Sequence, residues 1–65
     1  MTNEEIKNAL FSGCQVEHNG LIYKCVSAII YRLREGKLIL QAELLDKNCN
    51  SVIIADASRV MEVNL

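Results

Sequence analysis

The 65-residue sequence contains no tryptophan, no proline, three glycines and one histidine. It also lacks an excess of either charge, because seven Lys and Arg residues against eight Asp and Glu residues leave a formal net charge of −1. This balance is not that of a strongly basic nucleic-acid-binding protein, and a chain that is 51% hydrophobic is not typical of a disordered one. Composition alone therefore favours no class of partner.

Long apolar runs are absent as well. No run approaches the roughly 18 residues that cross a bilayer, and the first residues are acidic and amphipathic where a signal peptide is basic and then apolar. Three cysteines are an odd number without the spacing of a disulfide framework, which suits reduced thiols. We therefore expect a cytoplasmic protein without a membrane segment.

Few residues offer chemistry. Cys14, Cys25, Cys49 and His18 are four potential zinc ligands, but Cys14 and His18 would lie about 13 Å apart on one strand at about 3.3 Å per residue, too far for one ion. The carboxylates form no paired acid/base motif, and no phosphate-binding loop or nucleophile motif is present. We expect no metal, no cofactor and no enzymatic activity.

The N-terminal segment has the signals of a short helix. Thr2 is a good N-cap, Glu5 completes a capping box, and Met1 and Ile6 stand at the positions of a hydrophobic staple. Gly13 can adopt the left-handed backbone conformation that commonly ends a helix. A helix over 2–12 is predicted, with an apolar stripe that must pack on the rest of the chain.

Two hairpins follow. Asn19-Gly20 suits a type I′ turn, which pairs Val16 with Tyr23 and Cys14 with Cys25. Counting outward from a turn at Glu35-Gly36 gives the same alternation of inward and outward side chains along the strand that connects the two turns. Both turns then place one apolar set on the inner face: Cys14, Val16, Leu21, Tyr23, Cys25, Ser27, Ile29, Tyr31, Leu33, Leu38, Leu40, Ala42 and Leu44.

The remaining residues predict shorter elements. Residues 46–50 form a polar turn, 51–55 a β-branched strand, 56–58 a tight turn or one turn of 3₁₀ helix, and 60–63 a last short strand. The face of Val52 to Ala55 stays open, because the loop length decides it. We expect one domain over 1–65, with the helix over 2–12 and a small β-barrel over 14–65.

This order of elements resembles SH3-like barrels, whose last two strands are similarly joined by a 3₁₀ turn, here at Ala57-Ser58-Arg59. It also resembles Sm-like barrels, in which an N-terminal helix caps the sheet and a turn like Asn19-Gly20 starts the second strand. The resemblance implies a mainly β fold, a small five-stranded antiparallel barrel with a short N-terminal helix. The aromatic groove that binds proline-rich peptides has no counterpart here, since Tyr23 and Tyr31 are assigned to the inner face.

Two surfaces of the second hairpin are candidate binding sites. Arg32, Arg34 and Lys37 gather at its tip around Glu35, with Lys24 further along the strand. Such a cluster either attracts phosphates or an acidic protein surface, or keeps the hairpin hydrated and resistant to edge pairing. The side chains predicted to face outward are also unusually apolar: Ile22, Val26, Ala28, Ile30, Ile39 and Leu45. Either the helix and the curl of the barrel cover this apolar surface, or it is a homo-oligomer or partner interface.

These observations favour a non-catalytic binding module that acts through protein–protein contact, such as a small accessory or inhibitory protein of a bacterium or phage. The main alternative is an Sm-like or other nucleic-acid-binding barrel, with its cations in contact with phosphates. A third hypothesis is a small ligand- or metal-dependent protein. The candidate contact residues are Arg32, Arg34, Lys37, Lys24, Ile30 and Ile39.

Overall fold

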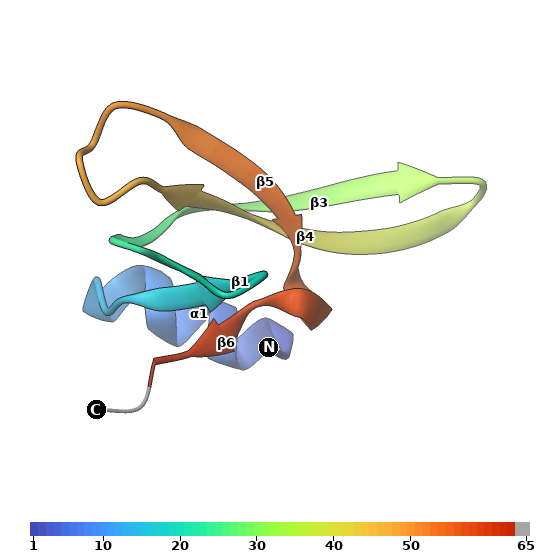
Figure 1. Cartoon of the computed structure of the whole chain (residues 1–65). Coiled ribbons are helices and arrows are strands. Elements are labelled where there is room, and N and C mark those ends of the chain that lie inside the picture. The colour runs from blue at the N-terminus through green and yellow to red at the C-terminus, as the bar shows by residue number, and fades with distance from the viewer. Residues whose placement is uncertain (64–65) are drawn as a thin grey trace.

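The computed structural model describes residues 1–63 and contains one helix, six strands and one 3₁₀ turn (Figure 1). The elements in chain order are α1 (Asn3–Ser12), β1 (Val16–His18), β2 (Leu21–Tyr23), β3 (Cys25–Arg34), β4 (Lys37–Leu45), β5 (Val52–Asp56), η1 (Ala57–Arg59) and β6 (Met61–Glu62).

The predicted helix is confirmed with its caps. The Thr2 side chain accepts a hydrogen bond from the backbone N–H of Glu5, and the Glu5 carboxylate accepts one from the backbone N–H of Thr2 at 2.8 Å. Gly13 ends the helix with a φ of 70°, and its N–H donates to the Ala9 carbonyl. Ile6 and Ala9 face the core, as the stripe requires.

Both hairpin turns are also confirmed. The φ angles are 53° and 78° at Asn19 and Gly20, and 52° and 76° at Glu35 and Gly36, as a type I′ turn needs. In the first hairpin Val16 pairs with Tyr23, but the ladder ends there, so the predicted pairing of Cys14 with Cys25 is wrong.

In the second hairpin the predicted register holds from the turn to Ile29 and Ala42, and then shifts. Ser27 is an extra residue between Val26, which pairs with Leu44, and Ala28, which pairs with Glu43. The Ser27 hydroxyl donates to the Glu43 side chain at 2.8 Å. The bulge reverses which side chains of the strand face the core, so Val26 is buried and Ser27 is exposed, opposite to the prediction.

The expected five-stranded barrel is wrong. The described residues form two three-stranded antiparallel sheets, in the orders β2-β1-β6 and β3-β4-β5, and neither sheet is closed. The long strand is interrupted at Lys24, so β2 pairs with β1 and β3 pairs with β4, while η1 separates β5 from β6. At the corner between the sheets, the Lys24 N–H donates to the Leu45 carbonyl at 2.8 Å.

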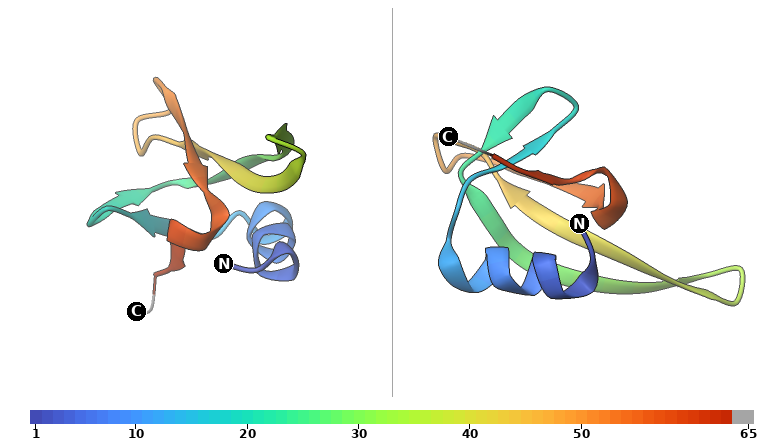
Figure 2. Two further views of the ribbon diagram at one scale, coloured as in Figure 1. Left: turned by 90° about the vertical axis from the view of Figure 1, so that its right-hand side faces the viewer. Right: turned by 90° about the horizontal axis from the view of Figure 1, so that it is seen from below.

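The core lies where α1 and the two sheets meet (Figure 2). It is small, because four of its nine buried apolar residues are alanines. Those nine are Ile6, Ala9, Val16, Val26, Ala42, Leu44, Ala55, Ala57 and Val60. The face of β5 that the sequence left open is now fixed: Ile53 and Ala55 turn inward, and Val52 and Ile54 are exposed.

Leu44 is the test of this core. Leu44→Ala should lower the free energy of unfolding by about 2–5 kcal/mol, because Leu44 is completely buried, whereas Leu38→Ala should change it by less than about 0.5 kcal/mol. Urea unfolding followed by circular dichroism measures both changes. Equal losses would contradict the assigned core.

The capping box predicts a pH effect. The hydrogen bonds from Thr2, first that of its backbone N–H, hold the pKa of Glu5 below the ordinary glutamate value. Because this pKa is lower in the folded chain than in the unfolded one, the stabilisation is complete above the ordinary value and is lost as the pH falls through the lowered one.

The Tm of the wild type should therefore fall more on acidification from pH 7 to about pH 3 than that of Glu5→Gln, whose amide oxygen accepts the same hydrogen bonds without titrating. Thermal unfolding of both proteins across this range measures the difference. Parallel curves would mean that the Glu5 charge contributes nothing to the cap.

Candidate binding surface

The most prominent feature of the surface is the outer part of the second hairpin, residues 31–40, which we call the arm. The pairing of β5 with β4 ends at Gln41, so within residues 1–63 neither strand of the arm pairs with a third strand. Figures 1 and 2 show the arm running past the N-terminal end of α1 and away from the rest of the chain. It accounts for a longest dimension of 36 Å against 23 Å and 21 Å in the other directions.

The outer face of the arm carries the predicted basic cluster. Arg34 lies opposite Lys37 in the ladder, and Arg32 lies opposite Ile39. All three cations are exposed. Ile30 and Ile39 are half-buried on the same face, so the structure brings together five of the six predicted contact residues.

Lys24 is the sixth predicted residue and lies elsewhere. It stands at the corner between β2 and β3, where its Nζ donates to the Cys49 sulfur at 3.2 Å across the turn after β4. It therefore does not extend the basic cluster of the arm.

A hydrogen-bonded network holds the base of the outer face. Arg32 Nε donates to Gln41 Oε1 at 2.9 Å, and Gln41 Nε2 donates to Asp56 Oδ1 at 3.1 Å. Gln41 is only 8% exposed and is the one buried polar residue of the described chain. Alternation along the strand places Gln41 on the same outward side as Ile39, but it does not show how closely neighbouring side chains cover that side.

The outer face continues onto β5 as an apolar surface. Ile54 lies beside Glu43, and Val52 beside Leu45, with the β-branched side chains exposed. The helix that was one candidate to cover the outward phase packs on the opposite, inner side of the sheet instead. No element among residues 1–63 covers this surface, whereas Val26, which was assigned to it, is buried by the Ser27 bulge.

The inner face of the arm was predicted to be core and is exposed. Tyr31, Leu33 and Leu38 are 54%, 72% and 69% accessible. They face the same side of the ribbon as Ala42, but the arm extends past the N-terminal end of α1, and Leu33 and Leu38 therefore remain exposed. The base of this face meets the start of the helix, where the Tyr31 hydroxyl donates to Asn3 Oδ1 at 2.7 Å.

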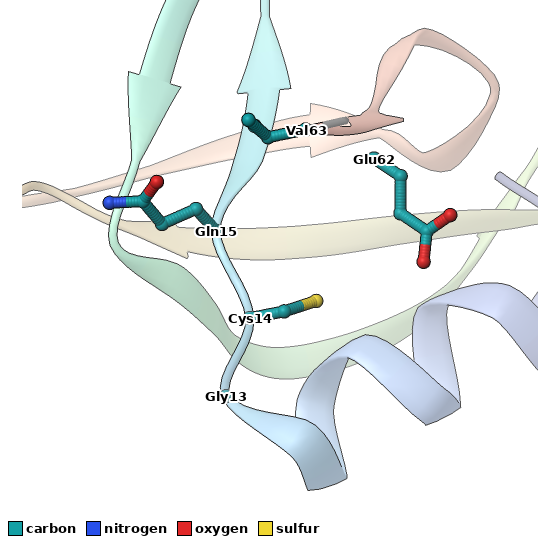
Figure 3. Close-up of a pocket in the computed structure, with 5 residues that line it drawn as sticks. All are labelled: Gly13, Cys14, Gln15, Glu62 and Val63. Carbon is teal, nitrogen blue, oxygen red and sulfur yellow. The ribbon is translucent and has the colours of Figure 1, made fainter. Parts of the chain in front are cut away.

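Two hollows adjoin β6. One, of about 380 Å³, is lined by Gly13, Cys14, Gln15, Glu62 and Val63. Figure 3 shows the Cys14 sulfur and the Glu62 carboxylate turned toward the gap between α1 and β6. His18 does not line the hollow, so the thiol has no imidazole beside it to act as a base.

The described residues include no cluster of three or more His, Cys, Asp or Glu side chains able to hold a metal ion. Cys14 and Cys25 are half-buried, Cys49 is exposed, and none of the three is in a disulfide. Within residues 1–63 no helix has both the length and the apolar character to cross a membrane.

Comparison with models of protein families, with curated proteins and with solved structures found no significant match.

The buried amide of Gln41 gives a direct test of the outer face. Gln41→Ala should lower the free energy of unfolding by about 1–3 kcal/mol, since it removes two hydrogen bonds that each contribute about 0.5–1.5 kcal/mol. Gln15→Ala, on an exposed residue, is the control and should change it by less than about 0.5 kcal/mol. Denaturant unfolding measures both, and a neutral Gln41→Ala would show that the network contributes no stability.

Proposed function

We propose that this protein is a non-catalytic binding module that acts through protein–protein contact, and that the outer face of the arm contacts an acidic surface of the partner. The observation that carries the proposal is the composition of that face: three exposed cations surround half-buried isoleucines on a ribbon that leaves the core. Arginine beside a partly desolvated apolar centre is the composition of energetically important interface residues.

The orientation of the cations supports a partner of negative charge. Arg34 and Lys37 face each other directly, which costs some stability in the free protein. An acidic surface docked over them removes this repulsion. Arg32 is already positioned by Gln41, so its guanidinium loses little conformational freedom on binding.

The composition of the same face favours a protein partner over a nucleic-acid partner. Lys24, the fourth cation expected to touch phosphates, lies at the far corner and donates to Cys49. Ile54 and Val52 continue the face with apolar area that phosphates do not contact. The free thiols are consistent with a reducing compartment, which supports a cytoplasmic location as part of this proposal.

The test begins with cross-linking in cells that produce the chain, followed by mass spectrometry to identify the partner and calorimetry on the purified pair. Arg32→Glu with Arg34→Glu should weaken binding at least tenfold, or about 1.4 kcal/mol, and leave the Tm nearly unchanged. Lys47→Glu with Arg59→Glu makes the same charge change at exposed sites outside the arm and should leave affinity within about threefold, or roughly 0.7 kcal/mol. Equal weakening by both pairs would remove the arm as the contact surface.

Nucleic-acid binding is measured separately, with labelled single-stranded and duplex DNA and RNA. We expect no saturable binding at about 50 mM salt. Binding that falls steeply between about 50 and 200 mM salt, and that the Arg32 and Arg34 reversal abolishes, would favour a nucleic-acid partner instead.

A further inference from the structure

One of the two binding edges of the Arg32 guanidinium is already occupied. A guanidinium meets a two-oxygen anion either with its Nε–H and one Nη group, or with its two Nη groups. Arg32 Nε donates to Gln41 Oε1 at 2.9 Å, so the first edge is taken. Among residues 1–63 neither Nη group has a hydrogen-bond or ion-pair partner, and Arg32 is exposed. The edge formed by the two Nη groups is therefore the one that another molecule can reach.

Asp56 determines which end of the Gln41 amide faces Arg32. A guanidinium only donates hydrogen bonds and an ionised carboxylate only accepts them, whereas an amide has one end of each kind. Gln41 lies between the two groups: its Oε1 accepts from Arg32, and its Nε2 donates to Asp56 Oδ1 at 3.1 Å. The reverse orientation of the amide would lose both hydrogen bonds. Residues of β3, β4 and β5 thus form a relay, Asp56 to Gln41 to Arg32, that holds the guanidinium in one orientation.

The neighbours of Arg32 favour a carboxylate over a phosphate as its ligand. Ile39 lies opposite Arg32 in the ladder, and Ile30 lies two residues before it on the same face. Both isoleucines are half-buried, so they limit the water around an anion bound beside them. A phosphate monoester carries a charge of about −1.5 to −2 and is costlier to desolvate than a singly charged carboxylate. A carboxylate is also planar, so its two oxygens can meet both Nη groups in one plane.

We propose that Arg32 is the specificity-determining residue of the arm and that its two Nη groups bind a carboxylate of the partner. Gln41 and Asp56 are positioning residues that act through Arg32. This inference rests on the proposed function, because it names the chemical group on the acidic surface that the arm contacts. Arg34 and Lys37 form no side-chain hydrogen bond within residues 1–63, so they supply charge without a fixed orientation.

The relay is tested on the free chain by nitrogen-15 NMR of the arginine side chains, which measures how fast each Nε–H exchanges with solvent. The Arg32 Nε–H should exchange about tenfold more slowly than that of Arg34, because it donates within the chain. Asp56→Asn should speed its exchange, since an asparagine both donates and accepts and leaves the Gln41 amide free to turn. Equal exchange at Arg32 and Arg34 in the wild type would overturn the relay, whatever the partner is.

The binding role is tested by titrating the chain with an oligoglutamate peptide and following the arginine resonances. Asp56→Asn removes a negative charge beside the arm, so charge alone would strengthen binding of this peptide. The relay predicts the opposite, a weakening of about threefold or more, because the guanidinium loses its fixed orientation. Glu62→Gln makes the same charge change in the other sheet and should leave the affinity unchanged. Stronger binding by Asp56→Asn would exclude a positioning role, and no shift at Arg32 with millimolar peptide would overturn the carboxylate site.

Arg32→Lys keeps the charge and removes the paired Nη groups. It should weaken binding of oligoglutamate about tenfold, because an ammonium group cannot make the planar two-point contact. Arg59→Lys is the matched control at an exposed arginine outside the arm and should have no effect. The loss caused by Arg32→Lys should be smaller for a phosphoserine peptide of equal charge. A larger loss for the phosphoserine peptide would assign the site to a phosphate and overturn the carboxylate.

The same variants separate this inference from the proposed function. On the partner identified by cross-linking, an unchanged affinity after reversal of Arg32 and Arg34 to glutamate would remove the arm as the contact surface. A loss on reversal, combined with unchanged binding by Arg32→Lys and Asp56→Asn, would leave the acidic contact in place and overturn only the oriented carboxylate site.

Discussion

One extra residue in β3 sets the orientation of every side chain on either side of it. At Ser27 the ladder gains a residue that β4 does not match, and the Glu43 side chain holds it by accepting the Ser27 hydroxyl proton in a hydrogen bond. Below this point Val26 enters the core, and above it Ile29 and Tyr31 take the same side. Without the bulge, Ser27 would replace Val26 beneath the helix, and a chain with so few large buried side chains has no spare one to lose.

The length of β3 and β4 explains the shape of the molecule. The same two strands supply both the core and the arm, so the arm continues the sheet that packs against α1. The outer face is anchored at Gln41, which joins β3, β4 and β5 through Arg32 and Asp56. The proposed contact surface is therefore presented on a supported base, whereas its tip depends only on the pairing of two strands.

Local chemistry made much of this predictable. Thr2, Glu5 and Gly13 specify the helix, and Asn19-Gly20 and Glu35-Gly36 specify both turns and the register next to them. Long-range relations were not predictable from those signals. No turn residue marks a bulge in the middle of an apolar run, so Val26 was assigned to the wrong face. Alternation also does not show where a strand extends past the elements that pack on it. Leu33 and Leu38 were therefore assigned to a core that does not reach them. Barrel closure failed for the same reason, since it depends on how far each strand extends beside its neighbours. The basic cluster was found because its residues are close in sequence, and Lys24 was misplaced because it is not.

The arm has one more consequence, for growth into larger assemblies. Both of its edges carry backbone donors and acceptors that no strand among residues 1–63 satisfies, and such edges are templates for the strand of another molecule. Many copies stacked in parallel register would place Arg34 on Arg34 and Lys37 on Lys37, and the repulsion would increase with every chain added. The charges at the tip therefore act as a gatekeeper: they oppose a fibrillar stack, in which like residues repeat, and leave discrete complexes as the accessible way to cover the ribbon.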